Sequence, residues 1–139
     1  YDQLHGRFLF LATSTTYANG FGVPNTSRLL LSVSNGATYD SGWKIWTMDI
    51  TADGTTPTTN WGDSWRLGFD NVAVYLSGNM FSAFNQFQYA KIRVISKAEL
   101  YSPTTDTLHW QEVGSAASKL MNEDKGRATA TIASSRSSV

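Results

Sequence analysis

Apolar and polar residues alternate along most of the chain with a period of two, which is typical of β-strands that bury one face. Turn dipeptides interrupt these stretches, and Asn35-Gly36 and Asp53-Gly54 are the clearest of them. Strands at this spacing, separated by polar loops, are typical of a sandwich of two antiparallel sheets. The pattern predicts strands over 7–13, 28–33, 43–50, 65–76, 91–98, 107–113 and 127–133.

Two segments have the spacing of a helix instead. Residues 80–87 carry apolar side chains at helical intervals, and residues 115–125 begin at Ser115, a good N-cap, and end before Gly126. Both segments are short, so we expect no more than one or two helical turns beside the strands.

These patterns together predict an all-β protein. The length of 139 residues fits a single domain, and the hydrophobic fraction of 41% is enough for a packed core. We expect one antiparallel β-sandwich domain over 1–133, arranged as a jelly roll, and a flexible serine-rich tail over 134–139.

Composition excludes several classes of protein. The 11 cationic and 11 anionic residues cancel, so no bulk charge attracts nucleic acid or a membrane surface. The absence of cysteine excludes disulfide scaffolds and thiolate zinc sites. No apolar run approaches the roughly 20 residues that cross a bilayer, so we expect no membrane partner. The chain opens at Tyr1 rather than at methionine, which indicates a trimmed or excised piece.

Candidate catalytic groups are few. His5 and His109 are the histidines, and neither lies near a glycine-flanked serine of the kind that a hydrolase triad uses. Glu99 and Glu112 could approach each other across two strands, as the paired carboxylates of a glycosidase do. Alternatively, both glutamates lie in solvent at the ends of strands and have no catalytic role. We therefore expect a protein that is not an enzyme, with no cofactor and no metal site.

Tryptophan is abundant, with 5 residues in the chain. Exposed indole rings stack on sugars, so Trp43, Trp46 and Trp61 are candidates for a carbohydrate-binding platform. The spacing of Trp43 and Trp46 places them on opposite faces of a regular strand, so one of the two would belong to the core.

A cationic strand face is the second surface candidate. In 91–98 the alternation predicts Ile92 and Val94 in the core, with the cations on the opposite, exposed face. Such a face could contact phosphate groups of a nucleic acid. Alternatively, it is an ordinary solvated face of the sheet without a binding role. The candidate nucleic-acid contacts are Lys91, Arg93 and Lys97.

The segment 75–103, YLSGNMFSAFNQFQYAKIRVISKAELYSP, resembles the early strands of single jelly-roll coat proteins from small icosahedral viruses. Coat proteins of circular single-stranded DNA viruses and of satellite RNA viruses are the nearest comparison. In addition, 5–10 and 29–31 resemble the late strands of such domains. The resemblance in 75–103 is carried by Phe84, Phe87, Tyr89, Lys91, Ile92, Arg93, Val94 and Pro103.

This resemblance implies a structural protein that assembles with copies of itself in a virion and contacts packaged nucleic acid. The self-assembly interface expected from it comprises Met80, Phe81, Phe84 and Phe87, since these side chains cannot all face one small core. The alternative is a secreted carbohydrate-binding module or lectin that uses the tryptophans. Particle mass distinguishes the two, because a coat protein forms large closed particles.

Overall fold

The computed structural model describes residues 1–17 and 24–114 and the backbone of 124–133. Strands account for most of these residues, and one short helix follows β8. The elements are β1 (Leu9–Tyr17), β2 (Pro24–Ser34), β3 (Trp43–Asp49), β4 (Ala52–Asp53), β5 (Thr56–Pro57), β6 (Trp61–Phe69), β7 (Ala73–Phe81), β8 (Phe87–Ser96), α1 (Lys97–Leu100), β9 (Thr107–Val113) and β10 (Asp124–Ala133).

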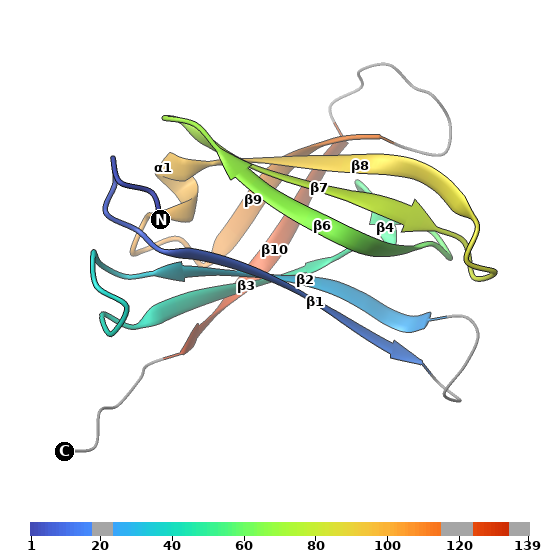
Figure 1. Ribbon diagram of the computed structural model, residues 1–139, viewed down its shortest axis with the longest axis horizontal. Helices are drawn as coiled ribbons and strands as arrows, with labels where there is room; N and C mark the ends of the chain where they lie inside the picture. Colours follow the sequence, from blue (N-terminus) through green and yellow to red (C-terminus); the bar gives the residue numbers. More distant parts are fainter. Residues whose placement is uncertain (18–23, 115–123, 134–139) are drawn as a thin grey trace.

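Eight strands form one continuous antiparallel sheet in the order β1-β2-β3-β10-β9-β8-β7-β6. The order consists of two meanders, β1–β3 and β6–β10, joined where the last strand pairs with β3. The sheet folds over so that β1–β3 and β6–β8 lie in two layers (Figure 1). The small β4–β5 hairpin lies on the connection between the meanders. The predicted all-β, sandwich-like class is confirmed, whereas this strand order does not confirm a jelly roll.

The core lies between the two layers, and alternate residues of each strand supply it, as the period of two requires. On β9, for example, Leu108 and Trp110 are buried while His109 between them is exposed. The buried hydrophobic side chains of the larger strands are Leu29, Leu31, Val33, Trp46, Met48, Val74, Leu76, Met80, Tyr89, Ile95, Leu108 and Trp110.

The helix predicted over 80–87 is wrong. Phe81 ends β7 and Phe87 begins β8, and the residues between them form a hairpin turn. The Ser82 N–H donates to the carbonyl of Gln86, and the Asn85 N–H donates to the carbonyl of Ser82. Asn85 has φ 58°, a conformation that asparagine tolerates better than most residues. Strand pairing on both sides therefore outweighs the helical spacing of the apolar side chains.

Two other expectations concern the end of the chain. The helix predicted over 115–125 lies almost entirely outside the described residues, and Asp124 already belongs to β10. The serine-rich tail over 134–139 also lies outside them.

A β-bulge in β6 places Trp65 over the glycine of the neighbouring strand. The β6–β7 register shifts between Asp63 and Arg66, and Ser64 in this bulge has φ 55°. A Cβ atom added at Gly78 would lie 2.4 Å from the Trp65 ring. By contrast, a Cβ added at Gly68 would meet no heavy atom within 4 Å. The Trp65 indole therefore packs directly against the backbone of Gly78.

These two glycines give a matched test of the packing. We expect Gly78→Ala to lower the free energy of unfolding by about 1–3 kcal/mol, because the rigid Trp65 ring must shift. Gly68→Ala should change it by less than about 1 kcal/mol, because the methyl group meets open space. Urea denaturation of both variants measures the difference. Equal values would show that Trp65 does not rest on Gly78.

Candidate functional site

The cationic face predicted on β8 points into the protein. Lys91 is 0% exposed and Arg93 is 1% exposed, whereas Ile92 is 40% exposed and Val94 is half-buried. The prediction that the cations face solvent is therefore wrong. The physical reason is that acidic side chains inside the sheet neutralise these cations, and Lys and Arg also bury long apolar stems.

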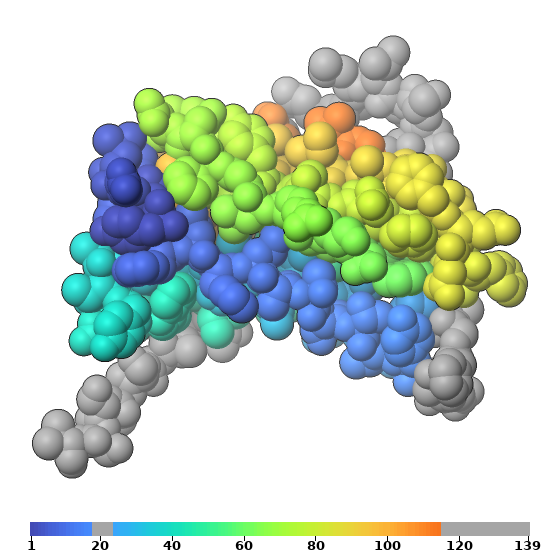
Figure 2. All heavy atoms as spheres, in the orientation of Figure 1, coloured from blue at the N-terminus to red at the C-terminus, as the bar shows by residue number. Residues whose placement is uncertain are grey.

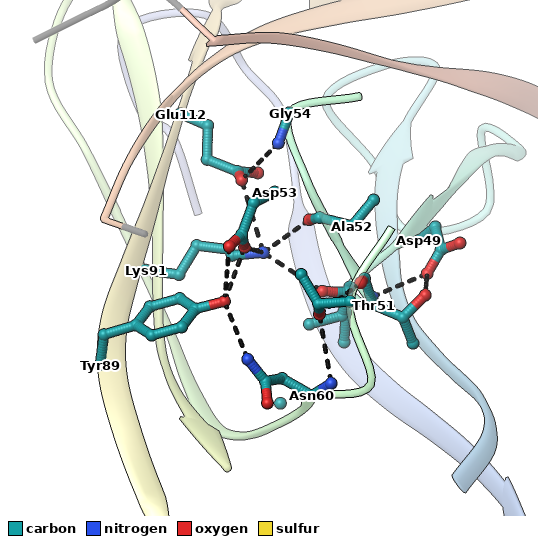
Figure 3. A network of polar contacts seen from close by, with 12 residues as sticks. Asp49, Thr51, Ala52, Asp53, Gly54, Asn60, Tyr89, Lys91 and Glu112 are labelled. Carbon is teal, nitrogen blue, oxygen red and sulfur yellow. Dashed lines mark hydrogen bonds and ion pairs between the residues drawn. The ribbon is translucent and has the colours of Figure 1, made fainter. Parts of the chain in front are cut away.

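The Lys91 ammonium lies among oxygen atoms of the β3–β4 connection (Figure 3). Its Nζ is 2.7 Å from a carboxylate oxygen of Asp53 and 3.4 Å from one of Glu112. It also donates to the carbonyls of Ala52 at 2.6 Å and Ile50 at 3.2 Å. Every donor of the ammonium therefore has a partner, as a buried charge requires.

Asp53 is held from a second side by a tyrosine. The Tyr89 hydroxyl donates to the Asp53 carboxylate at 2.7 Å, and the Asn60 amide donates to the tyrosine oxygen at 3.3 Å (Figure 3). Burial, together with the hydrogen bond to Asp53, raises the pKa of Tyr89 far above its usual value. The phenol therefore stays protonated and acts as a fixed donor.

Arg93 pairs with the other acid of the cluster. Its Nε donates to Glu112 at 2.8 Å, and one Nη donates to the carbonyl of Asp49 at 2.6 Å. The guanidinium carbon lies 4.7 Å from the centre of the Trp110 ring and 6.0 Å from that of Trp65. The other Nη has no partner among the described residues. We call Asp53, Lys91, Arg93 and Glu112 the interior ion cluster.

The third predicted cation belongs to a different network. Lys97, the first residue of α1, is buried and donates to Asp2 at 2.6 Å. The Tyr101 hydroxyl donates to the same carboxylate oxygen at 2.7 Å. Burial alone would raise the pKa of Asp2, but the hydrogen bonds from Lys97 and Tyr101 outweigh it and hold the pKa well below the usual range.

Nucleic-acid contact by Lys91, Arg93 and Lys97 is therefore a wrong prediction for this fold. Each of the three charges is buried and paired with a carboxylate inside the protein. A phosphate group could reach them only if the ion pairs broke, which costs several kcal/mol. The arrangement is structural rather than a binding surface.

The apolar residues predicted to form an interface divide into two groups. Met80 is fully buried in the core, so its assignment to an interface is wrong. Phe84 is 87% exposed and Phe87 is 59% exposed, while Phe81 is half-buried. The Phe81 ring lies 5.3 Å from that of Trp61 and 6.1 Å from that of Phe87. We call Trp61, Phe81, Phe84 and Phe87 the hairpin aromatic cluster.

The tryptophans predicted to form one sugar platform lie in different surroundings. Trp46 is fully buried, so its part in such a platform is wrong. Trp43 is half-buried beside Phe8 at a ring distance of 6.5 Å. Trp61 is half-buried in the hairpin aromatic cluster and donates its ring N–H to the carbonyl of Ser82. Trp43 and Trp61 therefore each keep a partly open ring beside aromatic side chains, but in different parts of the molecule.

The alternative acid pair of a glycosidase is not formed. Glu112 points into the interior ion cluster, while Glu99 lies outside and contacts His109 Nδ1 at 2.5 Å. His5 contacts Asp2 at 3.0 Å in the other ion network. Among the described residues, no three His, Asp or Glu side chains gather as a metal site needs, and no helix is long and apolar enough to cross a membrane.

Comparison with known proteins adds no relative. No protein-family model, curated protein or solved structure matches the chain.

Sequence reasoning missed the partners of the buried cations. Asp53 occupies a predicted exposed turn, and Asp2 precedes the first predicted strand. The position of Glu112 indicated that it is buried. It follows Leu108 and Trp110 at intervals of two residues, so the three side chains lie on the same buried face of β9. A buried acid requires a buried cation, and this requirement favours the inward orientation of β8.

The interior ion cluster leads to a stability prediction. Glu112→Gln should lower the free energy of unfolding by about 3–5 kcal/mol, because Arg93 would lose its carboxylate partner and stay buried. Glu99→Gln is the control, since it removes a partly exposed pair and should cost no more than about 1 kcal/mol. Urea denaturation at pH 7 measures both. Equal losses would contradict a structural role for the buried acid.

The Asp2 network leads to a pH prediction. A carboxyl group whose pKa is lowered by folding stabilises the protein above its unfolded pKa, near 3.8, and this stabilisation is lost as the pH falls. Wild type should therefore exceed Asp2→Asn in thermal stability by a constant amount between pH 5 and 7. Below about pH 4 the difference should shrink. Thermal unfolding across this range checks it, and a difference independent of pH would contradict it.

Proposed function

We propose that this protein is a self-assembling structural domain that contacts copies of itself through the hairpin aromatic cluster. The supporting observation is the exposure of Phe84 and Phe87 at the tip of the β7–β8 hairpin. The hairpin stands at one end of the molecule (yellow in Figure 2), away from the layered core.

An aromatic cluster at this place does not serve the core. The core is filled by Met80 and Tyr89, which point inward from the strand ends next to the turn. Exposing an aromatic side chain to water is unfavourable. Burying it against a partner lowers the free energy by about 25 cal/mol per Å² of apolar surface. Exposed aromatic side chains on one hairpin are typical of protein–protein contacts, where aromatic residues dominate the binding energy.

A second copy is the occupant that the surface fits best. A pocket of about 610 Å³, partly apolar, is lined by Val72 just before β7 and by Val94 and His109 on the outer side of β8 and β9. This pocket involves the α1 end of β8, whereas the hairpin tip is at the Phe87 end. A tip at one end and a pocket towards the other can join head to tail, which builds rings, filaments or shells.

The finer form of the proposal is a shell subunit, such as a viral coat protein, whose place is the virion. It involves no catalytic step. It also assigns no nucleic-acid contact to the cations of β8, because their charges are neutralised inside. A carbohydrate-binding role is the second candidate, and the partly open ring of Trp61 beside Phe81 is the observation that favours it.

The proposal predicts a change in particle mass. Phe84→Ser should keep the fold, because the side chain is exposed, and should reduce the sedimenting mass to that of the monomer. Tyr39→Ser is the control, since it removes another exposed aromatic group from a different loop. Analytical ultracentrifugation and circular dichroism measure mass and fold. A monomeric wild type that binds glycans would instead support the carbohydrate role.

A mixing experiment tests the head-to-tail geometry. Phe84→Ser removes the tip, and Val72→Lys places a charge at the pocket, so neither variant alone should assemble. In an equimolar mixture, the intact tip of one variant can enter the intact pocket of the other. We therefore expect heterodimers that grow no further. If the mixture stays monomeric while wild type assembles, the aromatic tips contact each other rather than the pocket.

A further inference from the structure

Lys44 differs from the other buried cations. Lys91, Arg93 and Lys97 each contact a carboxylate, but Lys44, on β3 and 7% exposed, has none within ion-pair distance among the described residues. Its ammonium donates to the carbonyls of Ser102, at 3.3 Å, and Thr105. The ammonium nitrogen also lies 4.9 Å from the centre of the Trp46 ring. An ammonium has three donors, so one of them has no hydrogen-bond acceptor among the described residues.

This lysine lines a pocket of about 430 Å³ between the ends of the two layers. The pocket lies among residues preceding β1, the end of β2 and the segment after α1. Arg7 also lines this pocket and is half-buried. The guanidinium of Arg7 donates to the carbonyls of Gly6 and His5, and it also lacks a carboxylate partner among the described residues.

Nearby acids do not neutralise this pair of charges. Asp2 is engaged by Lys97, Tyr101 and His5. Neither of the exposed acids in the adjoining loops, at positions 40 and 106, forms an ion pair with either cation. The pocket therefore carries two positive charges, one of them largely removed from water, and such a charge is costly without a counter-ion.

We propose that this pocket binds a small organic anion through a carboxylate group. The free N–H of Lys44 and the guanidinium of Arg7 donate charge-assisted hydrogen bonds to the carboxylate oxygens. Val33, Leu100 and Pro103 also line the pocket and contact the carbon part of the ligand. This mixture of a few polar anchors and an apolar wall is typical of small-molecule sites.

The proposal is independent of self-assembly. This pocket shares no lining residue with the pocket proposed to receive the hairpin tip, although both include residues of α1, and the hairpin aromatic cluster lies at the other end of β8. A variant that loses the anion should therefore keep its particle mass, and Phe84→Ser should keep anion binding.

Titration of the full chain with sodium benzoate tests the proposal, with neutral benzamide as the probe that keeps the ring and lacks the charge. Chemical shifts in an NMR titration should move at residues lining the pocket and give the dissociation constant. Lys44→Met and Arg7→Gln should each weaken benzoate binding about tenfold or more, which corresponds to about 1.4 kcal/mol. Arg66→Gln, which removes an exposed cation on β6, is the control and should leave binding unchanged.

Several outcomes would overturn the proposal. Benzamide binding as tightly as benzoate would exclude a charge-selective site. Equal binding by Arg66→Gln and Arg7→Gln would exclude the pocket, and so would shifts confined to other surfaces. Inorganic phosphate binding more tightly than benzoate would exclude an organic carboxylate as the ligand class. If Lys44→Met does not fold, Arg7→Gln decides the matter alone, because its side chain is only half-buried.

Discussion

The ion pairs between β8 and its acidic partners are the constraint on which the arrangement of the two meanders depends. Arg93 and Glu112 are directly opposite each other in the β8–β9 register, and Lys91 binds Asp53 in the connection that leads out of β3. A slip of one residue would turn both cations outward and leave Glu112 buried without a partner. Charge pairing therefore fixes the register and anchors the crossover between the meanders.

Alternation of residues predicts where the strands are but not which face of a strand is buried. Predicted and observed strands agree closely for β3 and β9, since their period of two is regular. The strand predicted over 91–98 begins four residues too late for β8 and runs into α1, and the single strand predicted over 65–76 is divided between β6 and β7. On β8, however, one face carries Ile92 and the other Lys91, and hydropathy alone favours the wrong one. The deciding partner, Asp53, is distant in sequence and occupies a turn, so only the folded chain reveals it.

The hairpin at 80–87 shows the same limit for a different reason. Its aromatic side chains have helical spacing, yet helices this short have little intrinsic stability, and β-pairing on both sides dominates. Part of the sequence interpretation is confirmed, because the residues do not all face the core. The structure separates them, with Met80 inside and Phe84 outside.

Burial of the cations also decides where surface chemistry can occur. Lys91, Arg93 and Lys97 are neutralised within the protein, whereas Lys44 and Arg7 line one pocket near the α1 end of β8 without a carboxylate partner among the described residues. The exposed aromatic side chains are at the opposite end, where the hairpin extends past the core. The interior ion cluster holds the strand between these two ends. The exposed aromatic side chains and the charged pocket therefore belong to different elements and can act separately.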